Sequence, residues 1–178
     1  MLGVGAAITL AAWNDSEFAT GEFEAGAFNL EGSIDGAAYA EHDTAAAAAP
    51  LSFSVDASNL SPGDSVSAPF AVRLDEATTY DAGVIVDQAG TSGTVSGLTY
   101  ELTTTDGFGC DSGTASSLVD AGTAVGSTDA NGAFDLVSGA EGVDGAPVNL
   151  CFTVTAGDDL VQGQSGTATW EFLAESQA

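Results

Sequence analysis

The side chains that usually carry acid–base or nucleophilic chemistry are scarce in this sequence. It contains one histidine, His42, and one basic side chain, Arg73, against 26 aspartates and glutamates. A catalytic zinc site needs several ligands in fixed geometry, and no paired-histidine motif is present. A serine–histidine–aspartate triad would need a GxSxG-type turn, which is also missing. Two carboxylates can hydrolyse glycosides, but no pair stands out. We therefore expect that the protein is not an enzyme.

The most ligand-like cluster is an acidic turn. Asp129, Asn131 and Asp135 carry oxygen atoms of the kind that bind calcium. A complete calcium loop also needs a twelve-residue spacing and a closing bidentate glutamate, and both are missing. A hairpin turn at the Asn131-Gly132 pair explains the cluster more simply. Calcium is a weak candidate ligand, and the sequence predicts no other cofactor.

Two cysteines offer redox chemistry or a covalent link. Cys110 and Cys151 are too few for a disulfide framework and lack metal-ligand spacing. If they pair, the bridge closes a loop of about 41 residues and stabilises the fold by roughly 4 kcal/mol on the chain-entropy account. The alternative is two unrelated buried thiols. The export features described below favour the bridge, because disulfides persist in oxidising compartments.

The charge balance narrows the range of partners. The formal net charge is −25, yet 44% of the residues are hydrophobic, so the composition is not that of a disordered acidic tail. Such a chain repels nucleic acid and has no basic patch for anionic lipid. Divalent cations and basic surfaces are its natural attractors. Solubility in salty surroundings is an alternative reason for the acidity.

Alternating apolar and polar residues recur along the chain, which indicates half-buried antiparallel strands. The alternating runs lie at residues 51–55, 66–74, 98–102, 148–154 and 168–172. Residues 82–87 contain three successive β-branched residues and predict a more fully buried strand. Glycine-rich turns separate the runs, and no helical period is sustained. The sequence predicts an all-β fold, a single antiparallel β-sandwich domain with jelly-roll-like topology.

Three local features refine this prediction. Pro69 has no N–H to donate, so its strand should lie at a sheet edge or carry a bulge. Residues 37–49 end in an alanine run before Pro50 and fit either a short helix or a surface loop. Cys151 points to the face opposite its apolar neighbours. Cys110 would therefore have to fold over the sheet to meet it.

The N-terminal segment has a different character. Its apolar run at residues 2–12 has the length of a signal-peptide core and is too short to span a bilayer. We interpret residues 1–11 as the remnant of an export signal; the alternative is an apolar first strand. Residues 12–31 then form an N-terminal extension with a first strand, and residues 32–178 form the β-sandwich domain. We expect a secreted protein, extracellular or at the cell surface, without a transmembrane span.

Three segments of the chain resemble the TasA/camelysin-type family of exported proteins. The stretch AAWNDSEFATGEFEAGAFNL at residues 11–30 is similar to the family's junction between signal and mature chain. The matching positions are Trp13, Asp15, Ser16, Phe23, Ala25, Gly26, Phe28 and Leu30. NLSPGDSVSAPFAV at residues 59–72 resembles the family's Leu-x-Pro-Gly-Asp turn before a strand. QGQSGTATWEFLA at residues 162–174 resembles its closing strand.

The resemblance implies a jelly-roll sandwich that polymerises into extracellular matrix fibres. In such fibres an N-terminal extension inserts as a strand into the neighbouring subunit. The chain would be a structural subunit of a biofilm-matrix type filament, with copies of itself as partner and other matrix components as further candidates. Trp13, Phe18 and Phe23 would anchor the inserted segment, residues 12–24. Some relatives carry a metalloprotease label, but matching zinc ligands are absent here, so that activity is not carried over.

Two alternatives to filament assembly remain open from the sequence. The segment at residues 12–24 would pair within its own domain as an ordinary first strand, or the protein would be a monomeric secreted adhesin that binds a glycan or protein through its loops. Stacking like-charged copies costs electrostatic work that salt screens. If filaments form, we expect mild acid, high salt or divalent cations to favour them.

Overall fold

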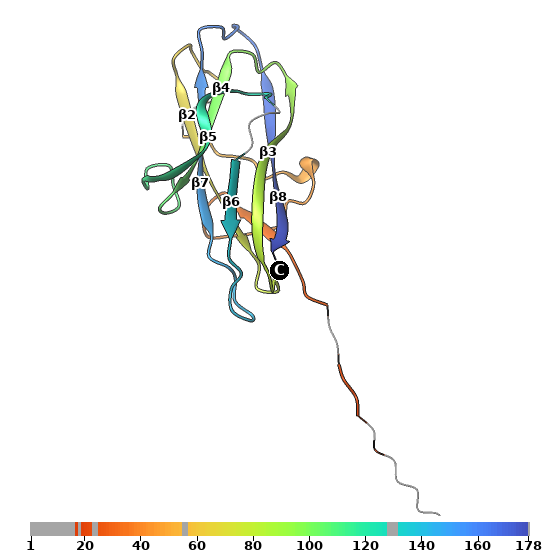
Figure 1. Cartoon of the computed structure of the whole chain (residues 1–178). Coiled ribbons are helices and arrows are strands. Elements are labelled where there is room, and N and C mark those ends of the chain that lie inside the picture. Colours follow the sequence, from red (N-terminus) through yellow and green to blue (C-terminus); the bar gives the residue numbers. More distant parts are fainter. Residues whose placement is uncertain (1–16, 18, 23–24, 55–56, 128–131, 178) are drawn as a thin grey trace, which may run out of the picture.

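A computed structural model describes residues 17, 19–22, 25–54, 57–127 and 132–177. These ranges contain eight strands and one 3-10 turn, η1 (Figure 1). The elements are β1 (Leu30–Ser33), η1 (Ala45–Ala47), β2 (Ser65–Leu74), β3 (Asp81–Gly93), β4 (Leu98–Thr105), β5 (Thr114–Ala124), β6 (Gly132–Leu136), β7 (Val148–Ala156) and β8 (Gly166–Gln177).

The described strands form two sheets that face each other. One has five strands in the order β1-β2-β7-β4-β5, and the other has three in the order β6-β3-β8. Every pair of neighbouring strands is antiparallel. The predicted all-β, antiparallel β-sandwich is therefore confirmed. Most neighbours in a sheet are distant in sequence, as in jelly-roll-like folds.

The core lies between the sheets and follows the alternation. In β2, Val66, Val72 and Leu74 are at most 1% exposed. Phe152 of β7 is also 1% exposed, and so is Val84 of β3. Inward side chains of both sheets thus form one hydrophobic cluster, because a strand directs alternate residues to opposite faces.

Two of the predicted strands need correction. Residues 82–87 do lie in β3, but this strand is not fully buried, since Ile85 is 44% exposed. The reason is that β3 has only its inner face against the core. Residues 51–54 form no strand, although Leu51 and Phe53 pack against the core. The remaining expected runs, at residues 66–74, 98–102, 148–154 and 168–172, all lie in strands.

The segment at residues 51–54 runs beside β2 but cannot continue a ladder there. The backbone N–H of Ser54 donates to the carbonyl of Ser67 over 2.8 Å. Two residues further along β2 stands Pro69, which directs its nitrogen to the same edge and has no N–H. β1 covers β2 only from Ala71 to Leu74. The expectation that Pro69 lies at a sheet edge is confirmed for this part of β2.

The alanine-rich segment at residues 37–49 forms no regular α-helix. It contains only the turn η1, which has no buried residue, and Thr44 before it makes no capping hydrogen bond through its side chain. The helix alternative is therefore wrong, and the surface-loop alternative agrees with the structure. Without a cap or a buried face, the alanine propensity alone does not sustain a helix.

The predicted disulfide is confirmed. Cys110 and Cys151 are bonded, with their Cα atoms 5.2 Å apart. Cys151 is only 5% exposed and lies on the outer face of β7, opposite the core residues of that strand. The loop at residues 106–113 therefore folds over the five-stranded sheet, as the alternation requires. A structural disulfide of this kind is typical of proteins that fold in an oxidising compartment.

Candidate functional site along the open edge of the sandwich

The strand β8 has one occupied and one open edge. It pairs along its length with β3, and no strand among the described residues pairs with its other edge. Its inward side chains Ala168, Trp170, Phe172 and Ala174 are all only half-buried. A long edge strand with few charges and no proline is a template for another strand. Within the described chain, β8 is the strand that most clearly has room for one.

The two sides of the sandwich differ. At one side β5 and β6 meet closely, since a Cβ on Gly132 would lie 2.9 Å from the Cβ of Leu118. At the other side β2 and β8 are separated by a groove of about 790 Å³. The sandwich is therefore closed at one side and open at the other.

The groove is largely apolar. One wall is residues 166–172 of β8, and the facing wall includes Val66, Phe70 and Val72 of β2. Phe152 and Val154 of β7 form part of its floor. The inward side chains of β8 that line the groove are half-buried, whereas Val66, Val72 and Phe152 are at most 1% exposed. A row of half-exposed apolar side chains along an unpaired strand is a common mark of a binding site.

Aromatic rings organise the floor of the groove. The ring centroids of Phe70 and Phe172 lie 5.3 Å apart, so these rings connect the two sheets. Phe152 packs against Trp170 with centroids 4.8 Å apart. Tyr100 lies behind Trp170 in the core, and its burial raises the pKa of its hydroxyl. These ring contacts join the two walls of the groove to its floor.

A strap, defined here as residues 41–54, passes over part of the groove. Alanines at positions 45, 48 and 49 line it, together with Leu51 and Phe53. The strap is joined to β2 through the Ser54–Ser67 hydrogen bond described above. His42 and its acidic neighbours Glu41 and Asp43 are exposed at the rim. The single histidine of the sequence therefore lies at the rim of the groove.

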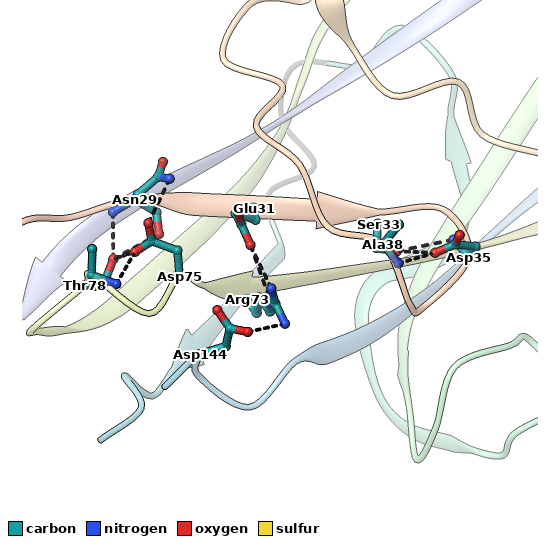
Figure 2. Close-up of polar contacts among 10 residues, drawn as sticks. Asn29, Glu31, Ser33, Asp35, Ala38, Arg73, Asp75, Thr78 and Asp144 are labelled. Carbon is teal, nitrogen blue, oxygen red and sulfur yellow. Dashed lines mark hydrogen bonds and ion pairs between the residues drawn. The ribbon is translucent and has the colours of Figure 1, made fainter. Parts of the chain in front are cut away.

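The N-terminal segment joins the sandwich at β1. A polar cluster holds Asn29, the residue just before this strand (Figure 2). The backbone N–H of Asn29 donates to the Thr78 hydroxyl over 2.8 Å, and its side-chain amide donates to Asp75 over 3.2 Å. The Thr78 hydroxyl also lies 2.7 Å from the Asp75 carboxylate. Burial acts to raise the pKa of Asp75, but the hydrogen bonds from Thr78 and Asn29 lower it below its ordinary value.

The only basic side chain of the sequence holds the middle of β1 (Figure 2). Arg73 contacts Glu31 of β1 over 3.0 Å and Asp144 of the loop before β7 over 2.8 Å. Its guanidinium also lies 4.0 Å from the centre of the Tyr39 ring. Burial raises the pKa of Tyr39, against the opposing effect of Arg73. One cation thus joins three segments that are far apart in sequence.

A third cluster closes the C-terminal end of β1 (Figure 2). Asp35 accepts hydrogen bonds of 2.8 Å from the backbone N–H groups of Ala37 and Ala38, and the Ser33 hydroxyl lies 3.0 Å from the same carboxylate. The Ala38 and Ala37 donors lower the pKa of Asp35. The Asp35 cluster thus fixes the turn after β1, while the Asn29 and Arg73 contacts and the backbone pairing hold β1 against β2 and the loop after it.

The residues upstream of β1 leave the sandwich. Ala27 makes an isolated bridge with Thr78, and residues 17 and 19–22 are exposed and belong to no strand. In Figure 1 the described part of this segment runs away from the two sheets. The predicted anchors Trp13, Phe18 and Phe23, and the export segment at residues 1–11, lie outside the described residues.

The other predicted site residues are placed only in part. Asp129 and Asn131 of the calcium candidate lie outside the described residues. Asp135 is on the exposed face of β6, where its carboxylate accepts a hydrogen bond from Gln177 over 3.4 Å. Among the described residues, no group of three or more histidine, cysteine, aspartate or glutamate side chains could hold a metal ion. The described part of the chain also has no helix long and apolar enough to cross a membrane.

Sequence reasoning did not identify the groove itself. The alternation at residues 168–172 indicated a half-buried strand, but the same pattern fits a strand with two neighbours. The available signal was Pro69, which indicated that the facing strand has an incomplete edge. A comparison with protein-family models finds no match for this chain, and a comparison with curated proteins finds none.

Proposed function

We propose that the chain is a structural subunit of an extracellular or cell-surface filament that assembles by β-augmentation. The segment upstream of β1 in one copy pairs with the open edge of β8 in the next copy and fills the apolar groove. The observation that carries this proposal is the combination of an open edge strand with an apolar groove and an N-terminal segment that leaves its own sandwich.

The geometry supports one direction of insertion. The N-terminal end of β1, the C-terminal end of β8 and the loop at residues 75–80 lie at the same end of the sandwich, which we name the exit pole. β8 begins at the opposite end, the receiving pole, near the loop at residues 94–97. In a head-to-tail stack, the segment leaving one exit pole meets the receiving pole of the next copy.

The inserted strand then runs antiparallel to β8. Its N-terminal end penetrates furthest, toward the exit pole of the accepting copy, while β8 runs from the receiving pole to the exit pole. The groove-lining part of β8 comprises residues 166–172. About seven residues of the segment at 12–24 are enough to match it, and the other half would span about 20 Å between copies. The available length therefore fits the proposal.

Insertion would gain backbone hydrogen bonds and apolar burial. Three or four residues in the groove-lining part of β8 direct their backbone groups to the open edge. Pairing them forms about seven hydrogen bonds at a net gain of about 0.5–1.5 kcal/mol each. Each large apolar side chain placed in the groove adds about 1.5–3 kcal/mol. These gains are of the same size as the association cost of about 4–15 kcal/mol, so assembly should be sensitive to single changes.

A truncation tests the proposal directly. A chain that begins at residue 25 should remain folded, because the three clusters on β1 are intact, but it should no longer form filaments in electron microscopy or sediment. Adding a synthetic peptide of residues 12–24 to this chain should raise its melting temperature in a concentration-dependent way. The stabilisation expected at a hundredfold excess over the dissociation constant is about 2.7 kcal/mol. A scrambled peptide is the matched control.

The outcomes separate this function from its alternatives. If the truncated chain still assembles as the longer chain does, the N-terminal segment is not the linking element and the proposal fails. If the longer chain is a monomer under all salt and pH conditions, the monomeric adhesin is the better description. If the truncated chain does not fold, the segment belongs to its own domain as an ordinary first strand.

A further inference from the structure

The outer face of the three-stranded sheet carries an exposed apolar row, away from the groove. Ile85 of β3 is paired with Leu173 of β8 on one side and with Ala133 of β6 on the other. Ile85 is 44% exposed and Leu173 is 52% exposed. No described element covers this face, because β6, β3 and β8 pack only their inner side chains against the five-stranded sheet.

Two acidic rows border the apolar row. Two residues before Ile85 along β3, Gly83 is paired with Asp135 of β6 and with Glu175 of β8. Two residues after it, Asp87 is paired with Glu171 of β8. Residues two apart in a strand share a face and lie about 6.8 Å apart along it. The face therefore presents carboxylates, then apolar side chains, then carboxylates at a regular spacing.

The first acidic row contains a hollow. A shallow depression of about 330 Å³ lies over Gly83 and is bordered by Asp135, Glu175 and Gln177. The φ angle of Gly83 is not positive, so its backbone does not require glycine. A Cβ added there would lie 2.8 Å from the side-chain amide nitrogen of Gln177, which extends over Gly83, and 3.9 Å from a carboxylate oxygen of Asp135. The hollow therefore lies between Glu175 and Asp135, and the Gln177 amide that borders it donates a hydrogen bond to Asp135.

Neither this chain nor a second copy can neutralise these carboxylates with lysine or arginine. The sequence contains a single basic side chain, Arg73, and this residue is already held by Glu31 and Asp144. Two copies that met through this face would bring eight carboxylates together. Charge complementarity therefore points to a different protein that carries lysine or arginine.

We propose that this face binds a basic segment of a second protein, in which one apolar side chain lies between two lysine or arginine side chains. In an extended segment the pattern basic-x-apolar-x-basic has the same spacing of about 6.8 Å as the three rows. One cation enters the hollow over Gly83, the apolar side chain covers Ile85 and Leu173, and the other cation reaches Asp87 and Glu171. This face is the outer side of the sheet whose inner side borders the groove, and Glu171 lies at the border of both.

Two labelled peptides of identical composition test the inference. One repeats the pattern, Lys-Ser-Val-Ser-Lys-Ser-Val-Ser-Lys, and the other groups its residues as Lys-Lys-Lys-Val-Val-Ser-Ser-Ser-Ser. Fluorescence anisotropy with the full chain at low salt should show that the patterned peptide binds about fivefold more tightly, the effect expected when two exposed ion pairs are gained. Equal binding of the two peptides would show that both are attracted only to the overall negative charge of the chain. That result would overturn the proposal.

Matched variants locate the binding. Gly83→Val fills the hollow, and Gly90→Val adds the same side chain further along β3, where an added Cβ meets nothing within 4 Å. Asp135→Asn with Glu175→Gln removes two charges from the face, and Asp158→Asn with Asp159→Asn removes two elsewhere. Gly83→Val, and Asp135→Asn with Glu175→Gln, should each reduce binding of the patterned peptide to the level of the grouped peptide. Gly90→Val, and Asp158→Asn with Asp159→Asn, should leave it unchanged. The proposal of a basic partner at this face is refuted if neither face variant weakens peptide binding. It is also refuted if the face variants change the self-association of the chain, measured by light scattering.

Discussion

Replacing Ala168 by phenylalanine gives the sharpest test of the groove. Ala168 is half-buried on the inner face of β8 and lines the groove beside Trp170. The added ring would occupy the space of one inward side chain of an inserted strand. The excluded side chain loses about 1.5–3 kcal/mol of burial energy, which raises the critical concentration for assembly about 10- to 150-fold. The free energy of unfolding of the monomer should not fall, because the ring covers apolar surface that is otherwise exposed.

The matched control is Ala121→Phe, since Ala121 is an exposed residue of β5 at the other side of the sandwich. The critical concentration is measured by sedimentation and the filaments are counted by electron microscopy, with urea unfolding to check the fold. The reasoning is refuted if Ala168→Phe assembles at the same concentration as the unchanged chain. It is also refuted if both variants weaken assembly equally, since the effect would then not belong to the groove.

Three further predictions concern the stability of the sandwich. Replacing Cys110 and Cys151 by alanine should lower the free energy of unfolding by about 4 kcal/mol, because the bridge closes a loop with a sequence separation of 41. Urea unfolding with and without reductant checks this, and equal stability of the bonded and unbonded chains would count against it. Arg73→Met should lower the free energy of unfolding by about 1–2 kcal/mol, since it removes two partly exposed ion pairs and a cation–π contact. The stability of Arg73→Lys should lie between that of Arg73→Met and that of the unchanged chain. A lysine variant as stable as the unchanged chain would show that charge alone matters, and one as unstable as the methionine variant would show that the guanidinium geometry matters. The pKa of Asp75 is lower in the folded chain than its ordinary 3.8, so its stabilising effect is complete above about pH 4 and is lost as the pH falls through the lowered value. Asp75→Asn should therefore be less stable than the unchanged chain at neutral pH and equal to it in strong acid, and a constant difference at all pH values would contradict this reasoning.

The sequence predicts the fold better than the site. The alternation of apolar and polar residues shows which side chains of a strand are buried, but not which strands lie beside it. The runs at residues 66–74 and 148–154 identify their strands, since inward residues such as Val66 and Phe152 must be apolar. The run at residues 51–55 carries the same pattern, yet Pro69 in the neighbouring strand has no N–H to continue a ladder. The disulfide could be predicted because two cysteines allow only one intramolecular pair.

The groove depends on the open edge of β8, beside which no described strand lies, and no single segment of the sequence encodes this arrangement. Trp170 and Phe172 would have the same alternation if another strand covered them. The clusters around Asn29 and Arg73 likewise join residues that are more than 40 positions apart, and such pairing follows from topology and not from local pattern. Their residues could be identified as polar positions in the sequence, but not as partners.

The attachment of β1 also has a mechanical consequence. β1 lies antiparallel to β2, and the chain upstream of it leaves along the strand direction at one end of the sandwich. In a filament, tension on this segment would pull β1 along its own axis. The backbone hydrogen bonds to β2, the Asn29 contacts and the Arg73 ion pairs would then bear the load together and not break one after another. The four residues of β1 would resist shear more strongly than their small number implies.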